Sequence, residues 1–272
     1  MRTATDAPRL LGAAFLFVLA ASVLGSALSA MSAGTADISS VLANISSHSM
    51  LYRGGILAEL ATGVGIVVLA VLLYEVLGKH NKLLARIALG WWLAEAVVLC
   101  VSQVGAFATI PLSSQYAGST AAQGPTLLGL GDSMYNGIEQ GGYNIHMLFY
   151  CLGALIWFYL FYATGAIPRR LALWGIIAET VAFAGMLVVL SGSQVSILFF
   201  AHIAPLELAV GLWPMACREG HYFPAVMTPH DRAGAGRGAT GRRRGAAARR
   251  SGCRGPSGYR ASGYRESVQL SM

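Results

Sequence analysis

Six apolar stretches, each close to the length that crosses a lipid bilayer, constrain the fold of this chain more than any other feature. A hydrocarbon core about 30 Å thick requires roughly 20 apolar residues at about 1.5 Å per residue. The stretches cover residues 10–30, 55–77, 87–109, 145–166, 171–190 and 197–216. Only 11% of the residues are charged, against about a quarter in soluble domains. The sequence therefore predicts an all-α, polytopic transmembrane helix bundle with about six spans.

Basic residues in the short connections predict how the spans are oriented, because Lys and Arg concentrate on the cytoplasmic side. Two turns, between the second and third spans and between the fourth and fifth, carry most of them: Lys79, Lys82, Arg86, Pro168, Arg169 and Arg170. The alternate connections contain only Arg53. We therefore expect both turns and both termini to be cytoplasmic.

Two segments leave alternatives open. The start, "MRTATDAPRLLGAAFLFVLAASVLGSALSA", also resembles a secretory signal that would be cleaved after Ala30 and would leave five helices. Residues 110–144 contain no Lys or Arg, so we expect a long outer loop there. The part "GPTLLGLGDSMYNGIEQ" is interpreted as a short interfacial helix within that loop.

Three carboxylates fall near the middle of the predicted membrane. Glu95 and Glu179 each follow a cytoplasmic arginine by nine residues, and Glu207 precedes Arg218 by eleven. These spacings correspond to depths of about 13 to 16 Å. The three residues are a candidate midplane site for a proton or cation. Alternatively, each is protonated or hydrogen-bonded and only holds the helices together.

A second candidate site lies at the outer surface. Arg53, Glu59, His146 and His202 are expected near that end of their spans, and with His48 they suggest a zinc hydrolase as an alternative function. Neither HExxH nor HxxxH spacing supports this alternative. Because the four cysteines show no CxxC spacing, we expect neither a disulfide framework nor a thiolate metal site, and we predict no cofactor.

The last span contains Pro205 between His202 and Glu207. A proline inside a helix removes one backbone donor and is expected to kink the helix at that point. A kinked helix can line a ligand cavity.

The order of several motifs resembles a bacterial membrane family called domain of unknown function 4386. The motifs are "LYRGGILAELATGVGIVVLAVLLYEVLGKHNKLLARIAL", "WWLAEAVVL", "HMLFYCLGALIWFYLFYATGAIPRRLALWGIIA" and "PLELAVGLW". The resemblance covers about residues 8–214 and implies a six-to-seven-helix protein of the bacterial cytoplasmic membrane with no established reaction. It also implies that recurrent polar positions of the family are occupied here by Arg53, Glu95, Pro168, Arg169 and Glu207.

Residues 218–272 differ in composition from the rest and depart from the family pattern. Residues 1–217 hold 8 Lys and Arg against 9 Asp and Glu, whereas the tail holds 11 against 3. Its Gly, Ala, Arg and Ser bias predicts disorder. Three interpretations stay open: a polybasic segment on anionic lipid, a nucleic-acid contact, which we favour least, and the product of a shifted reading frame.

Together these patterns predict a transmembrane domain over residues 1–217 and a tail over residues 218–272. The function we favour is a non-enzymatic bundle that binds or passes a small solute or a proton. The alternatives are the zinc hydrolase and a purely structural or regulatory membrane protein.

Overall fold

The computed structural model describes residues 7–34, 37–193, 195–196 and 199–216, and this part of the chain is helical with no strand. The helices are α1 (Ala7–Ala33), α2 (Ile38–Ser47), α3 (Ser49–Leu77), α4 (Lys82–Ala117), α5 (Gly124–Asp132), the π-helix η1 (Ser133–Gln140), α6 (Gly141–Thr164), α7 (Arg169–Leu190) and α8 (Ile203–Ala216). The predicted basic tail lies outside the described residues.

Five helices are long and apolar enough to cross a membrane. They cover the first five predicted spans, apart from residues 165 and 166 of the fourth, which confirms a transmembrane helix bundle. The sixth predicted span, 197–216, is shorter than expected, since α8 has only 14 residues and begins at Ile203. At about 1.5 Å per residue α8 is roughly 21 Å long, less than the hydrocarbon thickness.

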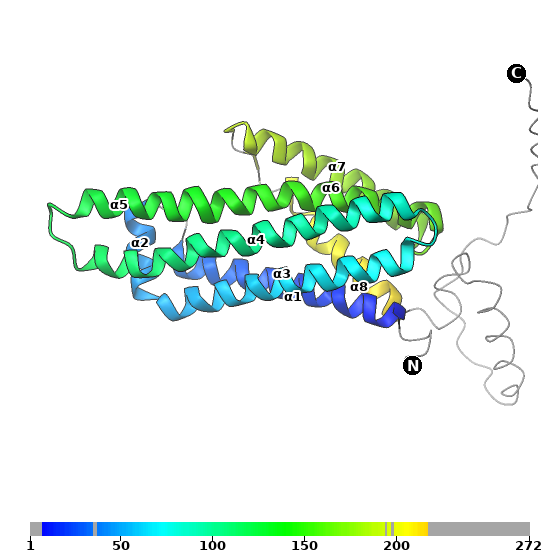
Figure 1. Ribbon diagram of the computed structural model, residues 1–272, viewed down its shortest axis with the longest axis horizontal. Helices are drawn as coiled ribbons and strands as arrows, with labels where there is room; N and C mark the ends of the chain where they lie inside the picture. The colour runs from blue at the N-terminus through cyan, green and yellow to red at the C-terminus, as the bar shows by residue number, and fades with distance from the viewer. Residues whose placement is uncertain (1–6, 35–36, 194, 197–198, 217–272) are drawn as a thin grey trace, which may run out of the picture.

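The prediction of a long outer loop over residues 110–144 is wrong. Helix α4 continues to Ala117, and only residues 118–123 separate it from α5. Segments α5, η1 and α6 then follow one another without a break over 41 residues. The two long rods run side by side, and their connecting turn lies at one end of the molecule (Figure 1).

Helix α4 passes through Pro111 without a break. The proline leaves Phe107 O without its helical donor, a loss that membrane helices tolerate. In the same stretch the Thr109 hydroxyl donates to Gly105 O at 2.9 Å, and the Ser113 hydroxyl donates to Ile110 O at 2.7 Å, so both buried hydroxyls are satisfied within the helix. The chain therefore continues as helix where a loop was expected.

The glycine at position 105 lets α4 approach η1 closely. A Cβ atom there would lie 2.7 Å from Met134 O and 2.8 Å from Ile138 Cβ. Small residues at helix interfaces allow this contact between backbones. It holds the π-helix η1 against the bundle. Residues 124–140, interpreted as a short helix within a loop, are helical as α5 and η1 but continue directly into α6.

Six helices form a closed ring. Each helix contacts the next in the order α8, α1, α3, α4, α6 and α7, and α7 contacts α8 to close the ring. The interior is packed with apolar side chains, among them Leu69, Leu99 and the fully buried Trp157. The shorter α2 packs against α4 at one end (Figure 1).

The outside of the ring is apolar. Val97, Val101 and Val104 project from α4 with 57 to 65% of their surface exposed. Their spacing of four and three residues places them on one helix face, opposite a polar side chain such as the buried Gln103. An exposed apolar face of this length is suited to lipid tails, so the chain is an integral membrane protein in a lipid bilayer.

The basic turns share one end of the bundle. The α3–α4 and α6–α7 turns lie at the same end as the start of α1 (Figure 1). Gly165 ends α6 in the left-handed conformation, with φ of 66°, and Pro168 precedes α7 in an extended conformation. Arg169 then lies 5.9 Å from the centre of the Tyr162 ring. Which side of the membrane this end faces stays a prediction.

Candidate functional site

Two of the three predicted midplane carboxylates share one tyrosine, and the third interacts with both of them. Glu95 lies on α4, Glu179 on α7 and Glu207 on α8, and Tyr150 reaches the last two from α6. The Tyr150 hydroxyl lies 3.1 Å from Glu179 Oε1 and 3.0 Å from Glu207 Oε1. Glu95 interacts electrostatically with both other glutamates. We call these four residues the acidic cluster.

The acidic cluster is deeply enclosed. Glu95 exposes 3% of its surface and Glu179 none, while Glu207 is partly buried. Within the described part of the chain, Glu95 Oε2 and Glu179 Oε2 are buried without a hydrogen-bond partner. Unpartnered buried oxygens are costly for a neutral carboxyl and more costly for a carboxylate. They are therefore atoms at which a bound cation or proton would be stabilising.

The proton count at Tyr150 favours at least one protonated carboxyl. A tyrosine hydroxyl has one proton and can also accept a hydrogen bond. If Tyr150 donates to one glutamate, a second full hydrogen bond at this distance requires the other glutamate to donate to the hydroxyl oxygen. The geometry is thus completed by one proton shared within the cluster.

Aromatic packing fixes the position of Tyr150. The Trp92 indole stacks on its ring with a centroid distance of 6.2 Å, and Trp92 Nε1 donates to Tyr150 O at 3.2 Å. Trp157 packs edge-on against Trp92 from about two turns further along α6. The sequence did not single out Tyr150, because a tyrosine among many aromatic residues of a membrane span has no distinguishing spacing.

The predicted outer site is not assembled. Arg53 is exposed and lies 5.7 Å from the centre of the Phe107 ring, whereas Glu59 and His146 are buried. His48 is exposed at the junction between α2 and α3. No group of three His, Cys, Asp or Glu side chains that could hold a metal occurs among the described residues. The set chosen for zinc therefore does not converge on one point.

His202 contacts the backbone of α7. Its Nε2 atom lies 2.8 Å from Ala178 O, next to Glu179 in the sequence. A carbonyl only accepts, so Nε2 carries the proton. This hydrogen bond ties the start of α8 to α7.

Pro205 does not kink a helix as predicted. Because α8 begins at Ile203, the proline lies in the first helical turn, where a missing backbone donor costs nothing. The proline within the body of α8 is Pro214.

A second group of buried polar side chains was missed. Glu139 of η1 is 7% exposed and accepts a hydrogen bond from the fully buried Tyr52 of α3. Glu59 interacts electrostatically with Glu139 and accepts from the Ser26 hydroxyl at 3.4 Å. We call Ser26, Tyr52, Glu59 and Glu139 the outer cluster. Placing Glu139 in a loop hid this group.

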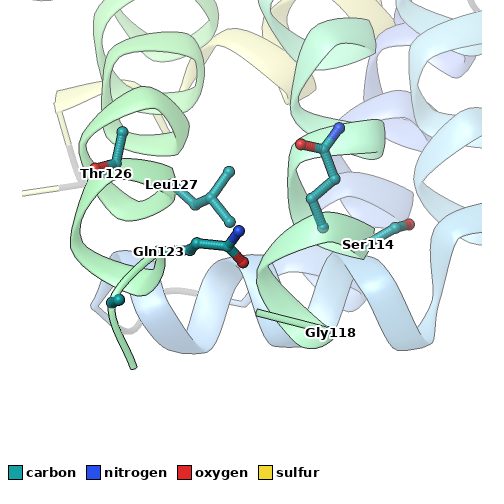
Figure 2. Close-up of a pocket in the computed structure, with 7 residues that line it drawn as sticks. Ser114, Gly118, Gln123, Thr126 and Leu127 are labelled. Carbon is teal, nitrogen blue, oxygen red and sulfur yellow. The ribbon is translucent and has the colours of Figure 1, made fainter. Parts of the chain in front are cut away.

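A surface groove lies apart from both clusters. It has a volume of about 570 Å³ and lies where α4 and α5 meet, at the end of the long hairpin (Figure 2). Its lining is formed by uncharged residues: Ser114, Gln115, Gly118, Ala122, Gln123, Thr126 and Leu127. The groove contains no titratable group, so it gives no reason to place chemistry there.

Comparison with known proteins gave one match. A family model described as domain of unknown function (DUF4386) matches residues 10–215. No curated protein and no solved structure matches the chain. The matched range contains both clusters and, apart from the first residues of α1, the five long apolar helices found in the described part of the chain.

Proposed function

Since the chain belongs to the DUF4386 family, whose description names no reaction, we propose a function from the acidic cluster itself: a non-enzymatic bundle that binds and passes a proton or another small cation. The observation that carries this proposal is the meeting of three buried carboxylates from three helices: Glu179 and Glu207 share the Tyr150 hydroxyl, and Glu95 interacts electrostatically with both. By the family resemblance, we place the protein in the bacterial cytoplasmic membrane, with the basic turns on the cytoplasmic side.

Electrostatics supports a positively charged ligand. In the described residues, the titratable groups that interact with the cluster glutamates are other glutamates, tyrosines and Cys151. Each charged carboxylate in an apolar interior costs several kcal/mol, on the order of the penalty for one buried ion. Bound protons or a cation reduce that cost, which makes the cluster a binding site rather than a simple packing element.

A purely structural role is the second candidate, and one observation favours it. Tyr150 connects α6 to α7 and α8 through its two carboxyl contacts, and such interhelical hydrogen bonds stabilise membrane bundles. Replacing the glutamates with glutamine separates the two roles, because an amide keeps its hydrogen-bonding capacity but cannot bind and release a proton as a carboxyl does.

The test is proton and cation flux into liposomes that contain the purified protein and a pH-sensitive dye. We expect flux in the wild type and none in the triple variant Glu95→Gln, Glu179→Gln, Glu207→Gln. Glu75→Gln is the matched control, since Glu75 is exposed near the end of α3, and it should retain wild-type flux. Flux that is unchanged in a folded triple variant, or absent from the wild type, would contradict the proposal.

A further inference from the structure

Polar side chains on one face of the η1–α6 rod connect the two clusters. Glu139, Tyr143, His146 and Tyr150 are spaced four, three and four residues apart, which is the spacing of one helical face. From Glu139 to Tyr150 the rod rises about 16 Å. The face therefore runs from the outer cluster to the acidic cluster through the interior of the bundle.

Tyr143 makes the contacts that join the two ends. It hydrogen-bonds with Ser26 of α1, whose hydroxyl also donates to Glu59 Oε1 at 3.4 Å. It interacts electrostatically with Glu59 and with Glu207. A single tyrosine thus interacts with one carboxylate of the outer cluster and one of the acidic cluster.

His146 adds a buried hydrogen-bonding atom beside this link. Its ring packs against Tyr143 with a centroid distance of 4.5 Å. The side chain is 6% exposed, and Nδ1 has no hydrogen-bond partner in the part of the chain that the structure describes. A ring nitrogen in this state can accept or release a proton.

We infer that Glu139, Glu59, Ser26 and Tyr143 form a proton path from the outer end of the bundle to the acidic cluster. The inference rests on the proposed function and narrows its ligand to the proton. Hydroxyl groups pass a proton by accepting one and releasing another, with no net change in their own protonation. They do not transport a metal cation, which requires several oxygen ligands at each position.

The surrounding groups are consistent with a path for positive charge. The side chains with polar atoms at the outer cluster come from α1, α3, η1 and α6: Ser26, Tyr52, Glu59, Tyr135, Glu139 and Tyr143. Ser102 and Gln103 of α4 are also buried, and Ser102 packs against Gly142. These residues are neutral or acidic, and the nearby cation Arg53 is exposed on the outside of α3.

The experiment follows the exchange of carboxyl protons for deuterons by time-resolved infrared spectroscopy on the full chain in lipid. The carboxyl band that disappears in the triple glutamine variant reports the acidic cluster. In Tyr143→Phe we expect this band to remain and its exchange rate to fall at least about tenfold, as for loss of a positioned proton-transfer group. Tyr159→Phe is the matched control, because Tyr159 lies on the same helix and is 51% exposed; it should exchange as the wild type does.

The outcomes separate the two proposals. Wild-type exchange rates in folded Tyr143→Phe would overturn the path while leaving the acidic cluster as a binding site. Absence of the assigned band from the wild type would instead contradict the proposed function. If Tyr143→Phe does not fold, Ser26→Ala breaks the same link from α1, and unaltered exchange in that variant would also overturn the path.

Discussion

Replacing Tyr150 with phenylalanine removes the hydroxyl at the centre of the acidic cluster and keeps the ring that stacks on Trp92. The hydroxyl makes two contacts, at 3.1 Å to Glu179 and at 3.0 Å to Glu207. Interhelical hydrogen bonds in membrane proteins contribute about 0.6 kcal/mol on average and up to about 1.7 kcal/mol. Loss of both contacts should therefore destabilise the bundle by about 1 to 3 kcal/mol.

The assay is reversible unfolding in mixed micelles, followed by tryptophan fluorescence as denaturing detergent increases. Tyr159→Phe is the control, since it removes a hydroxyl from the exposed face of the same helix and should change stability by less than about 0.5 kcal/mol. Equal stability of the two variants would refute the reasoning, because it would mean that the Tyr150 hydroxyl does not hold α7 and α8.

Three further predictions follow from the fold. Gly105→Ala should destabilise the protein by about 1 to 3 kcal/mol, because the added Cβ would overlap η1. In the control Gly90→Ala, the added Cβ would meet nothing within 4 Å beyond its own helix backbone, so this change should be neutral or stabilising. Equal melting temperatures of the two variants would contradict this packing. Asp37 caps the start of α2, and hydrogen bonds from Ser39 and Ser40 hold the pKa of its carboxyl below 3.8. The stabilisation by this cap is therefore fully present above pH 3.8 and is lost as the pH falls through the lowered pKa. Deuterium exchange of α2 should rise at acidic pH relative to Asp37→Asn at the same pH; parallel profiles would contradict it. Helix α4 is about 54 Å long and therefore extends beyond the hydrocarbon core. A cysteine that replaces Ser114 should react with a membrane-impermeant maleimide, whereas a cysteine that replaces Val97 should not. Protection of both cysteines would contradict the extension of α4 beyond the membrane.

Apolar length and carboxylate depth were informative in the sequence because both follow directly from helix geometry. The five long spans are found where the hydropathy places them. Glu95, Glu179 and Glu207 meet because their similar depths put them in one layer, which the spacing from the basic turns predicts. Which helix faces turn toward one another depends on packing, so the role of Tyr150 was not predictable.

The errors came from local rules that tertiary contacts override. The absence of Lys and Arg from residues 110–144 indicated a loop, yet α4 continues to Ala117 and close packing at Gly105 holds η1 against it. That error placed Glu139 outside the predicted spans and concealed the outer cluster. The histidines were grouped by approximate depth alone, and depth says nothing about the helix face on which each one lies.

The most direct test of the central claim is the infrared difference spectrum between the wild type and the triple variant Glu95→Gln, Glu179→Gln, Glu207→Gln at neutral pH. The structure predicts a band from a protonated carboxyl that is present in the wild type and absent from the variant. A spectrum in which the replaced glutamates contribute only ionised carboxylate bands would contradict proton binding by the acidic cluster.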